Sequence, residues 1–193
     1  SRRADMHAYK AGDSVDYRVT WLEMTKRPTY GWPSLPVGRE AMLVRADTPP
    51  WWYFLALYDA VGRDYAWTDK HEMPRDELND WIQHPEVALY SLIGKGWPKG
   101  FFMLDWREEN VCDLAYFGLV PEAVGRGLGT WLLKTAVMTA WERDTTEKLT
   151  VNTCTLDHPR ALIQYQKMGF SPVRTETHSR VLVNDQVFKQ PLL

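Results

Sequence analysis

The sequence contains little cysteine, no long apolar run and almost no excess of charge. Its two cysteines, Cys112 and Cys154, lack the close pairing that marks a metal site or a disulfide framework. Nowhere does the chain reach the roughly 18 consecutive apolar residues of a membrane-spanning helix, and its polar start lacks the apolar core of a secretory signal. We therefore expect a reduced, soluble, cytoplasmic protein with no membrane partner.

The charges nearly cancel, because 23 Lys and Arg residues stand against 25 Asp and Glu residues, for a formal net charge of -2. Such a chain has no field that would hold nucleic acid by itself. Its five histidines are scattered without the spacing of metal ligands, so we expect no metal. Tryptophan is the unusual component: ten of the 193 residues imply a thick core, an aromatic-lined pocket, or both.

The spacing of apolar residues predicts one α+β domain over residues 1–193. Alternating apolar residues mark strands, whereas apolar residues three and four apart mark helices. The strands are expected at 16–24, 40–45, 87–93, 100–106, 111–120, 149–154 and 171–182. The helices are expected at 50–61, 74–83 and 127–143, with a fourth that Asp157 caps and Gly169 ends. Short connections make the strands between 87 and 120 antiparallel, so we expect a mixed, mostly antiparallel central sheet flanked by helices.

Glycines gather where an expected strand runs into the long helix. Gly125, Gly127 and Gly129 lie in the sequence VPEAVGRGLGT, residues 120–130. Glycine lets the backbone turn sharply and leaves no Cβ in the way of a bulky anion. The first N–H groups of the helix lack internal partners, and the helix dipole adds positive charge, so a diphosphate fits there. By spacing alone, phosphate binding and ordinary turn chemistry are about equally favoured.

This turn resembles the signature of the GNAT superfamily of N-acetyltransferases, which is Gln or Arg, two residues, Gly, one residue, then Gly or Ala. The matching positions are 124–129, with Val124 in place of Gln or Arg. A second family pattern, Asn-x-x-Ala followed by Tyr-x-x-x-Gly-Phe, is similar to residues 157–161 and 165–170. Asp157 and His158 stand there where many members have Asn. The order of elements from about 17 to 180 also resembles the family.

The resemblance implies acetyl-CoA as the acyl donor. In the family, the strand, turn and helix that match residues 111–143 hold this co-substrate, mainly through backbone N–H groups. The residues expected to contact it are Leu119, Val120, Val124, Gly125, Arg126, Gly127, Leu128, Gly129, Thr130 and His158.

The reaction needs a donor for the leaving thiolate of CoA and an acceptor for the proton of the amine. The resemblance places Tyr165 beside the CoA sulfur as the general acid, although helical spacing alone would make it a core residue. Asp113, in an otherwise apolar strand, matches the position of the catalytic Glu in histone acetyltransferases of the family. A solvated Asp113 near the strand start is an equal alternative, and Glu109 is the reserve base. Both cysteines lie in apolar strands, so we expect direct attack by the amine without an acyl-enzyme.

The segment 50–83 corresponds to the acceptor side of the family's site, and it mixes aromatic residues with carboxylates. Such a surface suits a cationic or aromatic amine, and we expect Trp52, Tyr65 and Trp67 to contact it. The sequence therefore predicts acetyl transfer to a small-molecule primary amine. The alternatives are a catalytically silent acyl-CoA-binding or sensing domain and a protein Lys or N-terminal acetyltransferase. Dimers occur among relatives, which leaves a homodimer open.

Overall fold

The fold is described for residues 7–193 by a computed structural model. The strands are β1 (His7–Tyr9), β2 (Ser14–Met24), β3 (Met42–Arg45), β4 (Val87–Gly94), β5 (Trp97–Asp105), β6 (Val111–Leu119), β7 (Lys148–Cys154), β8 (Ser171–Val181) and β9 (Gln186–Phe188). The helices are α1 (Trp51–Gly62), α2 (Arg75–Ile82), α3 (Leu128–Glu142) and α4 (Ala161–Met168). The short 3-10 helices are η1 (Arg63–Tyr65), η2 (Asp69–His71) and η3 (Pro121–Ala123).

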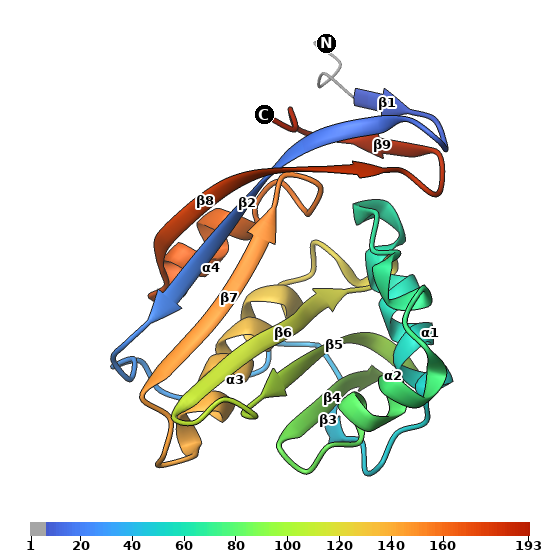
Figure 1. The fold of residues 1–193 in the computed structure, drawn as a ribbon. Helices are drawn as coiled ribbons and strands as arrows, with labels where there is room; N and C mark the ends of the chain where they lie inside the picture. Colours follow the sequence, from blue (N-terminus) through green and yellow to red (C-terminus); the bar gives the residue numbers. More distant parts are fainter. Residues whose placement is uncertain (1–6) are drawn as a thin grey trace.

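One sheet of seven strands organises the molecule, in the order β3-β4-β5-β6-β7-β2-β8 (Figure 1). Every neighbouring pair is antiparallel except β6 and β7, which are parallel. The expected mixed, mostly antiparallel sheet of an α+β fold is therefore confirmed. The position of β2 between β7 and β8 was not indicated by the sequence, nor was the small sheet that pairs β1 with β9.

The hairpin between β4 and β5 is tighter than the sequence suggested. We expected a strand from residue 100, but β5 begins at Trp97. Lys95 and Gly96 both have positive φ angles, 52° and 86°. This combination forms the two-residue turn that matches the twist of paired strands, so Pro98 and Gly100 enter the sheet.

Helices cover both faces of the sheet, α1 and α2 on one and α3 and α4 on the other (Figure 1). Phe54, Tyr58 and Leu78 are buried on the first face. Leu132 and Ala136, spaced by four along α3, are buried on the second. No helix between residues 7 and 193 has both the length and the apolar character that crossing a bilayer requires.

The parallel strands β6 and β7 stay together for only part of their length. Their pairing runs from Val111 opposite Lys148 to Asp113 opposite Thr150. Beyond these residues β6 continues to pair with β5, and β7 with β2, so the two strands separate (Figure 1). The sheet therefore opens in its middle.

Gly62, at the end of α1, supports the ring of Trp67, because a Cβ at this position would overlap the indole. We expect Gly62→Ala to lower the free energy of unfolding by about 1–3 kcal/mol, the usual cost of overpacking. Denaturant unfolding measures this change. Gly31→Ala is the matched control, because a Cβ there meets no atom within 4 Å, and its effect should stay within about 0.5 kcal/mol. Equal stabilities for the two variants would contradict the packing described.

Candidate active site

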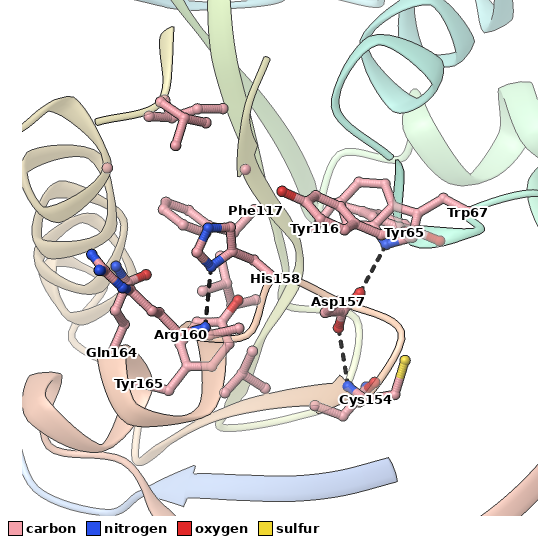
Figure 2. Close-up of a pocket in the computed structure, with 18 of the residues that line it drawn as sticks. Tyr65, Trp67, Tyr116, Phe117, Cys154, Asp157, His158, Arg160, Gln164 and Tyr165 are labelled. Atoms are coloured by element: carbon pink, nitrogen blue, oxygen red, sulfur yellow. Dashed lines mark hydrogen bonds between the residues drawn. The ribbon is translucent and has the colours of Figure 1, made fainter. Parts of the chain in front are cut away.

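A cleft of about 560 Å³ occupies the place where β6 and β7 separate (Figure 2). Its walls are residues 114–119 of β6 and the outer half of β7. The start of α3 and the side chains of α4 close one end, and the segment around η1 and η2 closes the other. The cleft therefore combines segments that lie far apart in the sequence, from Tyr65 to Arg180.

The turn before α3 presents backbone N–H groups at the first end of the cleft. Gly125 and Gly127 have φ angles of 82° and 80°, a region that side chains other than glycine rarely adopt. No side chain caps α3 and its first turn contains no acidic residue. Within residues 7–193, the N–H groups of 125–127 find no acceptor. Arg160, which lines the same end, adds a positive charge. These donors are suited to an anion such as a diphosphate.

The free edge of β6 offers a second set of main-chain groups. The Val120 N–H donates to the Lys99 carbonyl at 2.9 Å, so the amide of Val120 points toward β5. Because successive residues of a strand point their amides to opposite sides, the N–H groups of Leu119 and Phe117 face the cleft. Gly118 lies between them. Val61 of α1 packs directly on this glycine, so a Cβ at position 118 would overlap the Val61 side chain.

Tyr165 lines the cleft from α4 and is only 7% exposed (Figure 2). Its ring packs edge-on against Phe117 and Phe170, with centroids 6.4 and 5.8 Å away. Burial raises the pKa of Tyr165, and the carboxylates of Asp157 and Asp113 add to the rise. The phenol is therefore protonated at neutral pH, as a proton donor must be.

Asp157 links the two sides of the cleft. We expected it to cap α4, but α4 begins later, after Arg160, and has no side-chain cap. Instead the Asp157 carboxylate accepts hydrogen bonds from the Trp67 indole N–H (3.1 Å), the Thr153 hydroxyl (2.8 Å) and the Cys154 N–H (3.0 Å) (Figure 2). The prediction of a cap was wrong because both carboxylate oxygens of Asp157 accept hydrogen bonds from these donors instead.

The second end of the cleft is aromatic and acidic. Tyr65 and Trp67 line it as expected of acceptor contacts, together with Tyr116 and Asp69. One Asp69 oxygen accepts the Tyr58 hydroxyl at 2.6 Å. Trp52 lies elsewhere: it is 57% exposed and does not line the cleft.

Asp113 does not share this cleft. It lines a separate hollow behind Tyr116, and its carboxylate accepts the Thr150 hydroxyl at 2.7 Å. Burial raises the pKa of Asp113, and the negative charges of Asp105 and Glu108 act in the same direction. Glu109 is exposed and lines neither space.

Two other titratable side chains in the cleft are uncharged at neutral pH. The His158 Nδ1 accepts the Arg160 N–H at 3.1 Å, and burial together with Arg160 and Lys189 lowers the His158 pKa. Burial and the nearby Asp157 raise the pKa of Cys154 to about 12, so it is a thiol and a poor nucleophile.

Most residues expected to contact the acyl donor come together in the cleft. The ones that line it are Leu119, Val124, Gly125, Gly127, Gly129, Thr130 and His158. Val120 and Leu128 are buried beside it, and Arg126 is exposed outside its lining. Sequence reasoning missed Arg160, Gln164, Asp69 and Arg180. The first two lie one helical turn apart at the start of α4, a signal that the family pattern already contained.

Comparison with known proteins agrees with this geometry. Residues 54–170 match the acetyltransferase (GNAT) family, whereas no curated protein matches the chain. Among solved structures, a GCN5-related N-acetyltransferase from Kribbella flavida is 16% identical with a TM-score of 0.53, over 90% of this chain and 58% of its own. A tandem GNAT protein from the clavulanic acid biosynthesis pathway is 16% identical with a TM-score of 0.60, over 89% of this chain and 55% of its own.

An aminoglycoside N-acetyltransferase, AAC(6')-Iy in complex with CoA, is 16% identical with a TM-score of 0.51, over 73% of this chain and 95% of its own. The chain thus spans little more than half the length of the first two structures, 58% and 55%. The family match covers more than half of the chain. The chain therefore belongs to the GNAT acetyltransferase family, and so to a family of acyltransferases that draw on acyl-CoA.

Proposed function

We propose that this chain transfers the acetyl group of acetyl-CoA to a primary amine of a small molecule, by direct attack within a ternary complex. The observation that carries the proposal is that one cleft contains both the uncapped glycine turn of α3 and the buried phenol of Tyr165. An anion cradle and a protonated donor within one cleft are the two groups that a CoA thioester requires. The related fold of an aminoglycoside N-acetyltransferase that binds CoA supports this choice.

The residues of the cleft fit acetyl-CoA. The N–H groups of Gly125, Gly127 and Gly129, with Arg160, would hold the diphosphate. The N–H groups on the free edge of β6 would bind the amides of the pantetheine arm, as a strand pairs with an added strand. The thioester supplies an activated acyl carbonyl whose carbon–sulfur bond breaks as the new carbon–nitrogen bond forms.

Two side chains of the cleft, Asp69 and Tyr165, would transfer the protons. Asp69 accepts a proton from the amine, because one of its oxygens has no partner among residues 7–193, whereas both Asp157 oxygens are engaged. The geometry favours Asp69 over Asp113, which lies behind Tyr116. Tyr165 donates its phenolic proton to the departing sulfur and regains one from solvent. A backbone N–H of β6 stabilises the negative charge that develops on the carbonyl oxygen.

A screen for release of CoA thiol from acetyl-CoA with amines, amino acids and peptides tests the proposal as a whole. We expect small amines to be acetylated in preference to peptides, because the aromatic side chains of Tyr65, Trp67 and Tyr116 line the acceptor end. Acetyl-CoA binding without release of CoA in any mixture would favour the silent binding domain instead. The cytoplasmic location and the homodimer stay predictions from the sequence.

Loss of the Tyr165 hydroxyl should separate catalysis from binding. We expect Tyr165→Phe to lower kcat by about 10²- to 10⁴-fold, the usual contribution of general acid catalysis, with acetyl-CoA affinity nearly unchanged. Steady-state kinetics and calorimetry measure the two quantities. Tyr90→Phe is the control, because Tyr90 packs on the same core but does not line the cleft. Full activity in Tyr165→Phe would remove this residue from the mechanism.

The anion cradle should be sensitive to its backbone conformation. Gly127→Val forces a side chain into a φ of 80°, at a cost of about 1–3 kcal/mol, and reorients the N–H groups. We expect the acetyl-CoA affinity to fall by about 5- to 100-fold in titration calorimetry. Gly12→Val carries a similar strain, at φ 90° in the turn before β2, and should leave this affinity unaltered. If both variants bind equally well, the diphosphate lies elsewhere.

Removal of the charge on Asp69 tests the proton acceptor. In Asp69→Asn the side-chain oxygen can still accept the Tyr58 hydroxyl, so the fold should persist. We expect kcat to fall by about 10²-fold with little change in acetyl-CoA affinity. An unchanged kcat would show that another group takes the proton.

A further inference from the structure

A second hollow, of about 390 Å³, lies under α2 next to the cleft. The two spaces share Ala115 and Tyr116 as a common wall. Asp69 lines the cleft and its neighbour Lys70 lines the hollow, so η2 forms the rim between them. The acceptor end of the cleft and the hollow are therefore adjacent, separated by Ala115, Tyr116 and η2.

The charged side chains of the hollow differ in the hydrogen bonds and ion pairs that they make. Asp105 accepts three hydrogen bonds from the Arg107 guanidinium, at 2.8 to 3.1 Å, one from the Arg107 backbone N–H at 3.0 Å and one from the Trp81 indole N–H at 3.2 Å. Lys70 lies over the Trp81 ring, 5.0 Å from its centroid. Within residues 7–193, no cation lies within 4 Å of the carboxylates of Asp113 or Glu77.

This leaves the hollow with a formal charge of -1, because three carboxylates (Glu77, Asp105 and Asp113) face two cations (Lys70 and Arg107). Asp105 pairs with Arg107 and Glu77 is exposed, whereas Asp113 is partly buried, accepts a hydrogen bond from the Thr150 hydroxyl and has a pKa that burial raises. A buried carboxylate without a cationic partner is costly, and a bound cation relieves that cost. The aromatic ring of Tyr116 adds attraction for the same charge, whereas Lys70 already lies over Trp81.

The shape between the two spaces suits a methylene chain. Met73, Ala115, Trp81 and Tyr116 provide apolar walls. Asp113 and Tyr116 are three residues apart on β6, a distance of about 10 Å at the usual rise of a strand. An acceptor amine beside Asp69 and a second ammonium beside Asp113 would lie on either side of Tyr116.

We propose, on the basis of the acetyl transfer proposed above, that the acceptor is a linear diamine or polyamine whose reacting amine lies in the cleft and whose second ammonium pairs with Asp113 in the hollow. Asp113 is then a specificity-determining residue and not the base. The apolar walls accommodate the chain between the two nitrogens, and the hollow becomes neutral when it is filled.

The test compares linear diamines of increasing length with monoamines of the same chain length, as substrates of the protein and of Asp113→Asn. We expect kcat/KM for the best diamine to exceed that of its matched monoamine by about 10- to 100-fold, the contribution of a charge-assisted hydrogen bond. Asp113→Asn should abolish this preference through KM, with kcat and the monoamine reaction nearly unchanged. Glu109→Gln, which removes an exposed carboxylate outside both spaces, should retain the preference.

Calorimetry of the best diamine with the CoA-bound protein gives a readout that does not depend on turnover. Binding that is lost in Asp113→Asn but kept in Glu109→Gln supports the inference even if no amine is acetylated, an outcome that would refute only the proposed reaction. Equal rates for diamines and monoamines, with equal binding, overturn the inference and leave acetyl transfer intact. A loss of kcat for every amine in Asp113→Asn also overturns it and makes Asp113 the base.

Discussion

The separation of β6 and β7 after Asp113 and Thr150 is the constraint on which the site depends. Up to that point the two strands satisfy each other's backbone groups, as neighbours in a sheet must. Beyond it, among residues 7–193, each strand pairs with one neighbour, so the inner edge of β6 has N–H and C=O groups without a strand partner. A buried edge of this kind is costly unless water or a ligand fills it. The opening that interrupts the sheet therefore also provides the donors that a strand-like ligand needs.

The electrostatics of the cleft follow from its depth. Burial favours the uncharged form of each titratable side chain, which keeps Tyr165 and Cys154 protonated and His158 neutral. Asp157, in the same cleft, accepts three hydrogen bonds. The same Asp157 joins β7 to Trp67, whose ring lies over Gly62. One carboxylate thus joins β7 to the segment that carries Trp67, on the other side of the cleft.

Local patterns in the sequence were enough to predict the seven strands of the main sheet and the four helices, though not β1, β9 or the start of β5. Two motifs were enough to bring Tyr165 and the glycine turn into one expected site. Pairing across long separations was not predictable, because β2 has the same alternating pattern whichever strands it joins. Trp52 shows a second limit: helical spacing identifies residues that share a face, but the direction of that face depends on how α1 packs. Asp69 lies in a short 3-10 helix within an irregular segment, where no periodicity marks a functional residue.

The position of β2 has a consequence for how the molecule reaches its native state. This strand lies between β7 and β8, so Val19 pairs with Cys154 on one side and with Glu176 on the other. Such contacts join the two ends of the chain, and closing so long a loop is entropically unfavourable until many interactions form together. The wall of the cleft that β7 provides is therefore expected to become rigid late in folding, after the local meander of β4, β5 and β6 and only once both ends of the sequence are present.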